Sequence, residues 1–235
     1  MSLGLLGTII FFAYVPALMI LWYFYHQDFL EPEPPSYVFG TFILGATLST
    51  GMAYILEGVF TLGGMIKPLL PQTAFYVALV AGVVEEPAKA LAVYLLPYRM
   101  RQMDGIMDGI VYGVAAGLGF AATENFLYGL GWGVSVTLFR AFLTPFVHGT
   151  WTAIVGVGLG LKSEGRIQSV SGFLILAVVL HFIWDYYAFI SAYNPLYNLL
   201  LLFLLGLNGL ILWYLMTIAR IEEFQKWLWR RFWRW

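Results

Sequence analysis

The chain has 235 residues, of which 61% are hydrophobic and only 11% are charged, and its formal net charge at pH 7 is −1. Soluble domains contain about 45–50% apolar and about 25% charged residues. This composition, with a mean hydropathy of +0.81, therefore excludes a soluble globular domain, a disordered chain and a nucleic-acid binder. It predicts a protein embedded in the lipid bilayer over most of its length. Because the chain has no cysteine, disulfides, thiolate catalysis and cysteine-ligated metal sites are also excluded.

Seven apolar stretches follow one another along the chain, each long enough for a membrane-spanning helix of roughly 20 residues. Lipid cannot satisfy free backbone polar groups, so these stretches must be helical. They cover, approximately, residues 4–25, 37–59, 72–97, 105–129, 133–161, 168–191 and 195–219. We therefore predict an all-α fold, a polytopic membrane helical bundle of about seven transmembrane helices, in which residues 1–221 form a single domain.

Basic residues are concentrated at three of the predicted connections, and Lys and Arg in short loops set the orientation of a membrane protein. The connections 129–133 and 191–195 carry no charge. The basic residues are Arg99 and Arg101 after the third span, Lys162 and Arg166 after the fifth, and five Lys or Arg residues from Arg220 onward. With seven spans these segments share one side. This predicts a multi-pass cell-membrane protein with its N-terminus outside and its C-terminus in the cytoplasm.

The tail, residues 222–235, alternates aromatic and basic side chains. This pattern is typical of an amphipathic helix at the membrane interface, where aromatic rings meet the headgroups and basic side chains meet anionic lipid. We predict such an interfacial helix after the last span.

Glycines recur at short intervals in the fourth and fifth spans. They are Gly113, Gly117 and Gly119, and then Gly156, Gly158 and Gly160. Small residues let transmembrane helices approach closely, so both spans are predicted to make tight helix–helix contacts.

Ionisable residues inside the predicted spans are the strongest functional signal, because a charged group in a bundle costs several kcal/mol unless it is paired or hydrated. The deep ones are Glu85, Glu86, Lys89, Glu124, His148, His181 and Asp185, whereas Glu57 and Arg140 lie nearer the outer ends of their spans. Counting residues at about 1.5 Å each puts acidic or imidazole groups of four helices between the midplane and the outer third. This shared depth predicts one hydrated cavity joining Glu85, Glu86, Glu124, His148, His181 and Asp185.

Two chemistries fit these residues. In the first, a carboxylate is the general base that activates a water, and His and Asp side chains support the developing oxyanion. In the second, His148, His181, Glu124 and Asp185 bind Zn²⁺, which itself generates the hydroxide. The chain has no His-Glu-x-x-His motif, the best-known helical signature of a zinc protease.

At these positions the chain resembles the PrsW family of intramembrane proteases, a family related to the type II CAAX prenyl endopeptidases. The motifs that carry the resemblance occur in order on successive spans. They are the acidic segment Asp28–Glu33, Glu85-Glu86-Pro-Ala-Lys89, Asp108-Gly-Ile-Val-Tyr112 with Phe120-x-x-x-Glu124-Asn125, Arg140 with Pro145 and His148, and His181-x-x-x-Asp185.

The resemblance implies hydrolysis of a peptide bond in a membrane-associated protein, which in bacterial members is an anti-sigma factor. Carried over from the CAAX relatives, Glu85 is the base, Glu86 its partner, and His181 with Asp185 the oxyanion side. Asp185 stands where the CAAX enzymes usually have Asn, so it must be protonated or must orient His181 instead. Glu124 stands where they have His, and both departures favour the PrsW family. The family is often labelled a metalloprotease, but the CAAX relatives favour catalysis without a metal, which we expect here.

Two other classes of function are compatible with buried ionisable groups. A proton- or ion-coupled transporter uses Glu, His and Asp relays, but it is favoured by inverted repeats, which this sequence does not display. A noncatalytic membrane scaffold is disfavoured by the full set of Glu, His and Asp residues.

Overall fold

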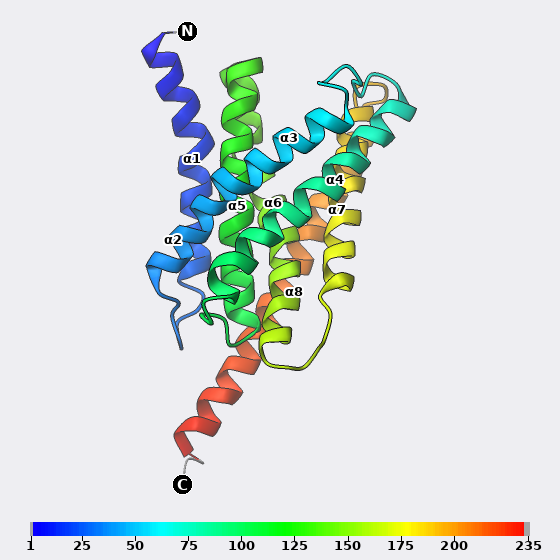
Figure 1. Cartoon of the computed structure of the whole chain (residues 1–235). Coiled ribbons are helices and arrows are strands. Elements are labelled where there is room, and N and C mark those ends of the chain that lie inside the picture. Colours follow the sequence, from blue (N-terminus) through cyan, green and yellow to red (C-terminus); the bar gives the residue numbers. More distant parts are fainter. Residues whose placement is uncertain (1, 233–235) are drawn as a thin grey trace.

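A computed structural model describes residues 2–232, and these residues form helices with no strand among them. The elements are α1 (Leu3–Tyr25), α2 (Pro35–Leu44), the π-helical turn η1 (Gly45–Ser49), α3 (Thr50–Phe60), α4 (Pro71–Val93), the π-helical turn η2 (Tyr94–Tyr98), α5 (Ile106–Trp132), α6 (Val134–Ser163), α7 (Ser171–Ile190) and α8 (Tyr197–Phe232). The predicted all-α polytopic membrane bundle is confirmed (Figure 1).

Six helical runs of the described chain are long and apolar enough to cross a membrane: α1, α2–η1–α3, α5, α6, α7 and α8. The remaining predicted span, residues 72–97, corresponds to α4, which is as long as α1 but holds Glu85, Glu86 and Lys89. These charged residues lower its apolar character, and all three are buried inside the bundle. The predicted second span is one run, Pro35–Phe60, interrupted by η1. Together α3 and α4 run obliquely across the bundle (Figure 1).

The centre of the bundle is formed by residues 106–122 of α5 and residues 144–160 of α6, almost all of which are buried. Their backbones touch where glycines face each other: a Cβ on Gly156 would lie 1.8 Å from the carbonyl oxygen of Gly109. A Cβ on Gly117 would lie 2.4 Å from the carbonyl oxygen of His148. Small residues therefore bring these helices to backbone contact, as the glycine spacing predicted. The outer helices α1, α7 and α8 expose large apolar side chains, which suits contact with lipid.

Local chemistry sets several helix ends. The Ser2 hydroxyl accepts a hydrogen bond from the backbone N–H of Leu5 and caps α1, and prolines occupy the first positions of α2 and α4. Only one residue, Gly133, separates α5 from α6, and its φ of +90° is readily adopted by glycine.

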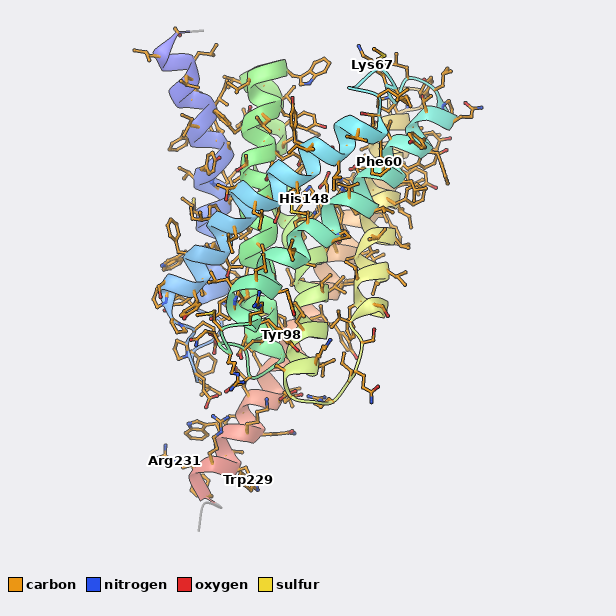
Figure 2. All side chains as sticks on the ribbon, in the orientation of Figure 1. Phe60, Lys67, Tyr98, His148, Trp229 and Arg231 are labelled. Carbon is orange, nitrogen blue, oxygen red and sulfur yellow. The ribbon has the colours of Figure 1, made fainter. Side chains whose placement is uncertain are left out.

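The predicted interfacial tail is continuous with the last span, because α8 runs without a break from Tyr197 to Phe232. Its final turns, with Trp229 and Arg231, project beyond the other helices (Figure 2). The last three residues of the predicted tail, 233–235, lie outside the described residues. The tail's position at a membrane interface remains a prediction.

The two ends of the described chain lie at opposite ends of the bundle (Figure 1). The α6–α7 connection lies at the same end as the late part of α8, because Arg166 Nη1 is 2.7 Å from Glu222 Oε2. Reporter fusions at Ser163 and at the C-terminus are therefore both expected to read cytoplasmic, as the basic connections predict. An extracytoplasmic reading at either fusion point would contradict this topology.

Candidate active site

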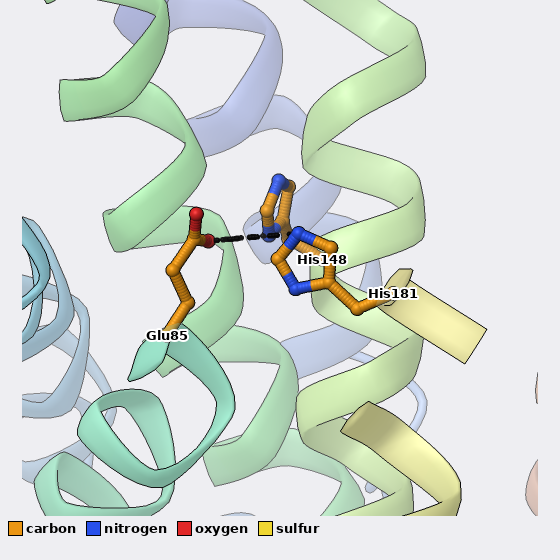
Figure 3. Close-up of side chains that lie close together, drawn as sticks. All are labelled: Glu85, His148 and His181. Carbon is orange, nitrogen blue, oxygen red and sulfur yellow. Dashed lines mark ion pairs between the residues drawn. The ribbon is translucent and has the colours of Figure 1, made fainter. Parts of the chain in front are cut away.

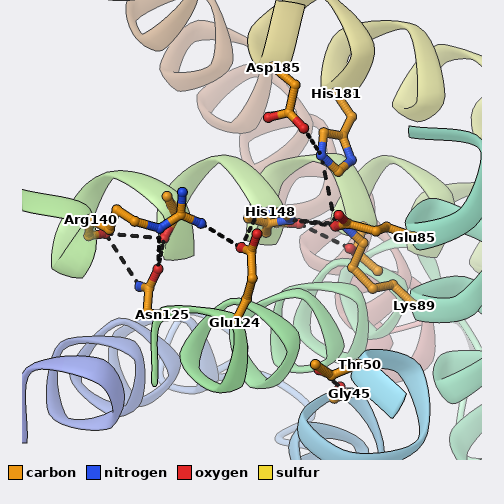
Figure 4. A network of polar contacts seen from close by, with 12 residues as sticks. Gly45, Thr50, Glu85, Lys89, Glu124, Asn125, Arg140, His148, His181 and Asp185 are labelled. Atoms are coloured by element: carbon orange, nitrogen blue, oxygen red, sulfur yellow. Dashed lines mark hydrogen bonds and ion pairs between the residues drawn. The ribbon is translucent and has the colours of Figure 1, made fainter. Parts of the chain in front are cut away.

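All seven deep ionisable residues identified in the sequence take part in one polar network, which is buried except at the partly exposed Glu124 and Asp185. Glu85, Glu86 and Lys89 come from α4, Glu124 from α5, His148 from α6, and His181 and Asp185 from α7. Figure 4 shows most of this network, and Figure 3 its centre, where Glu85 faces the two imidazoles. Four consecutive helices, α4 to α7, therefore converge on one point in the middle of the bundle.

The Lys89 ammonium contacts three other members of the network. Its Nζ lies 2.5 Å from Glu86 Oε1, 3.5 Å from Glu85 Oε2 and 2.8 Å from His148 Nδ1. The Lys89 side chain is fully buried, and so is that of Glu86. A buried charge requires a partner to offset the lost hydration, and Lys89 and the two glutamates meet that need for one another.

The two histidines differ in their hydrogen-bond partners. His148 Nδ1 faces the Lys89 ammonium, which can only donate, so Nδ1 accepts and Nε2 carries the proton. That Nε2 lies 3.4 Å from Glu124 Oε2. His181 instead faces carboxylates on both sides, with Nδ1 2.8 Å from Glu86 Oε1 and Nε2 3.3 Å from Asp185 Oδ2. Both of its nitrogens can donate only when the ring carries two protons.

Glu124 is held from the other side by Arg140, whose Nη2 lies 2.7 Å from Glu124 Oε2. Arg140 is in turn held by Asn125, because Arg140 Nε donates to Asn125 Oδ1 at 2.9 Å. The Thr144 hydroxyl donates to the same oxygen at 2.8 Å. This chain of contacts ties α5 to α6 and fixes the orientation of the Glu124 carboxylate.

Aromatic rings enclose the imidazoles. The Trp151 indole stacks on His181 with ring centroids 4.5 Å apart, and Phe120 lies 5.5 Å from the His148 ring. The Lys89 ammonium lies 4.6 Å from the Phe120 centroid. These rings exclude water from one side of the network and so strengthen the electrostatic interactions within it.

A cavity of about 280 Å³ adjoins the network between α3, α4, α5 and α7. Its acidic lining consists of Glu57, Glu85, Glu124 and Asp185, and it extends to Trp132 at the end of α5. Since one water occupies about 30 Å³ in the liquid, the cavity has room for several waters. It reaches three of the six residues expected to share a cavity. Glu86, His148 and His181 instead lie buried beside it. Both imidazoles contact carboxylates that line the cavity, whereas Glu86 contacts Lys89 and His181.

Two contributors were not included in the site predicted from the sequence. Glu57 was placed near the outer end of its span, but the oblique course of α3 brings it to the cavity wall. Asn125 is fully buried and positions Arg140. Its place beside Glu124 was the available signal, because an amide next to a carboxylate in an apolar span also requires partners.

A metal ion would find its donors at the centre of the network. One ligand atom each of Glu85, His148 and His181 lies within 4.8 Å of the others. Two imidazoles and a carboxylate are a donor set that suits zinc. The zinc ligands predicted from the sequence were His148, His181, Glu124 and Asp185. In the structure, Glu85 joins the two histidines instead of Glu124 and Asp185. The Glu124 carboxylate is directed at Arg140. Lys89, however, already occupies His148 Nδ1 and approaches Glu85 Oε2 with its own positive charge.

Comparisons with a family model and with known proteins identify the same family. Residues 33–215 match the family described as "PrsW family intramembrane metalloprotease". The chain is 32% identical over 179 residues to "Protease PrsW" of Bacillus subtilis, covering 73% of this chain and 78% of that protein. It is 31% identical over 176 residues to "Protease PrsW" of Halalkalibacterium halodurans, covering 74% of this chain and 80% of that protein. No solved structure is significantly similar.

Proposed function

Since the chain belongs to the PrsW family of intramembrane proteases, we propose that it hydrolyses a peptide bond of a membrane-associated protein with a water activated by Glu85. Membership of this family decides against the transporter and scaffold interpretations. The observation that carries the mechanism is the position of Glu85. It lines the cavity while its Oε2 lies 3.8 Å from His181 Nε2 and 3.5 Å from Lys89 Nζ.

The proposed reaction assigns each residue of the network one role. The Glu85 carboxylate takes a proton from a water in the cavity as the water oxygen attacks the peptide carbonyl carbon. Before the reaction, Glu86 and Asp185 orient the His181 ring through its two nitrogens. As the oxyanion forms, it takes the place of Asp185 as the acceptor from the Nε2–H, while Glu86 keeps Nδ1. Glu85 then returns the proton to the leaving amine as the carbon–nitrogen bond breaks.

Lys89, His148 and Glu124 act through other groups in this proposal. Lys89 holds Glu85 and Glu86 in place with its positive charge. His148 joins Lys89 to Glu124, and Arg140 compensates the charge of Glu124. These positioning residues hold the carboxylates of Glu85, Glu86 and Glu124 in fixed places beside the cavity.

The proposed substrate is a single-span membrane protein of the anti-sigma-factor kind that the family resemblance implies. The cavity runs from Glu85 towards Trp132, at the end of α5 away from the projecting end of α8. With the predicted orientation, this end faces the outside. A peptide entering from that face meets Glu85 near the middle of the bundle.

The proposal is tested by incubating the purified protein in detergent with candidate single-span substrates and measuring the masses of the products. Cleavage by the native protein and none by Glu85→Ala is expected. Products that form equally with the variant, or cleavage by neither protein across the candidate set, would count against it.

The donors Glu85, His148 and His181 would hold a zinc ion, which would supply a Lewis acid that lowers the pKa of a bound water. We propose catalysis without a metal, because Lys89 places a positive charge against Glu85 and His148. The expected result is full activity in protein that has been stripped with a chelator and contains far less than one metal ion per chain. Near-stoichiometric zinc, with activity lost to the chelator and restored by Zn²⁺, would refute this expectation.

A further inference from the structure

A second cluster of buried carboxylates lies away from the candidate active site. Asp28 is in the connection after α1, Glu33 stands just before α2, and Asp108 is in the first turn of α5. These parts of the chain meet at the end of the bundle from which α8 projects (Figure 1). One carboxylate oxygen of each residue lies within 4.8 Å of the others.

All three side chains are removed from water, since Asp28 is 1%, Glu33 7% and Asp108 5% exposed. Three acidic groups this close are therefore costly to ionise on their own. A compensating positive charge is needed to keep all three carboxylates charged.

The cations of the described residues do not supply that charge. Among residues 2–232, no Lys, Arg or His side chain lies within 4.0 Å of these carboxylates. The nearby cations have other partners: Lys226 pairs with Glu164 and Glu222, and Arg230 with Glu31.

Asp28 is the decisive member. Both of its carboxylate oxygens are buried without a hydrogen-bond partner within the described chain. By contrast, Glu33 accepts from the Tyr112 hydroxyl and Asp108 accepts from the backbone N–H of Asp104. A buried polar side chain that makes no hydrogen bond points to a ligand outside the chain.

From these contacts we propose that Asp28, Glu33 and Asp108 bind a divalent cation of the Mg²⁺ or Ca²⁺ kind. Such hard cations take carboxylate oxygens at about 2.0–2.6 Å, so two oxygens sharing one ion lie at most about 5 Å apart, which agrees with the observed spacing. Oxygen donors without imidazole or thiolate favour Mg²⁺, Ca²⁺ or Mn²⁺ over zinc. The ion would join the α1–α2 connection to the start of α5. This site is separate from the proposed proteolytic chemistry and does not depend on it.

The test is calorimetric titration of the cation-depleted protein in detergent with Mg²⁺ and, separately, with Ca²⁺. About one ion per chain is expected to bind, and Asp28→Asn is expected to weaken binding at least about tenfold. Glu31→Gln is the matched control, because Glu31 lies in the same segment but is exposed and paired with Arg230. Glu85→Gln controls for binding at the candidate active site. Both control variants are expected to bind like the native protein.

Thermal unfolding separates a cation site from a purely structural role. The native protein is expected to unfold at a higher temperature as the cation concentration rises, whereas Asp28→Asn and Glu33→Gln are expected to be insensitive to it. No binding to the native protein at millimolar cation, unchanged binding in Asp28→Asn, or loss of binding in Glu85→Gln would each overturn the proposal.

Discussion

Replacing Glu85 by glutamine is expected to lower the rate of peptide-bond cleavage by about 10²–10⁴, the usual contribution of a general base. Glutamine has nearly the same shape and keeps an oxygen that can accept from Lys89, whose Nζ lies 3.5 Å from Glu85 Oε2. It cannot take a proton from water at neutral pH. The loss should therefore appear in kcat, while the helices stay folded.

The matched control is Glu57→Gln, which makes the same change in another carboxylate of the cavity wall. Glu57 forms no ion pair with the imidazoles or with Lys89 within the described chain, so its loss should be much smaller. Rates for both variants are measured with purified protein and one substrate under single-turnover conditions. If Glu85→Gln cleaves as fast as the native protein, the glutamate mechanism is wrong.

The second large effect is expected at the contact between α5 and α6. In Gly156→Ala the new Cβ would meet the Gly109 carbonyl oxygen at 1.8 Å, which is backbone and cannot rotate away. The two helices must separate, and overpacking of this kind costs about 1–3 kcal/mol or more. A loss of 1 kcal/mol lowers the melting temperature by about 2–4 °C in a chain of this size. Thermal unfolding in detergent should therefore show a decrease of several degrees.

Gly149→Ala is the control on the same helix. Its Cβ would lie 3.7 Å from Leu118, an ordinary van der Waals distance. Alanine is also favoured over glycine within a helix, so this variant should be as stable as the native protein or slightly more so. Equal melting temperatures for Gly149→Ala and Gly156→Ala would show that close backbone contact does not limit stability here.

Separation of α6 from α5 in Gly156→Ala would also change the candidate active site. His148 lies on α6, and its carbonyl oxygen is the atom against which Gly117 packs. The imidazole position thus depends on the same close approach that the glycines allow. Gly156→Ala is expected to reduce cleavage as well as stability, with the reduction smaller than that of Glu85→Gln.

The sequence alone was sufficient for the class of protein, the approximate positions of the long helices and the family resemblance. Apolar runs of helix length can only be helices in lipid, and residue counting places Glu85, His148 and His181 at similar depths because the rise per residue is constant. The motifs around these residues were the basis of the family resemblance, and the match over residues 33–215 agrees with it.

Only the tertiary structure decided which side chains meet, because the rotation and tilt of each helix are set by packing against its neighbours and not by its own composition. The oblique course of α3 brings Glu57 to the cavity, and the facing glycines of α5 and α6 bring His148 towards Glu124. Lys89 reaches both glutamates and His148 because α4 presents that face inward. Asp28, Glu33 and Asp108 come together for the same reason: the connection after α1 packs against the first turn of α5, a contact between segments that no local pattern encodes.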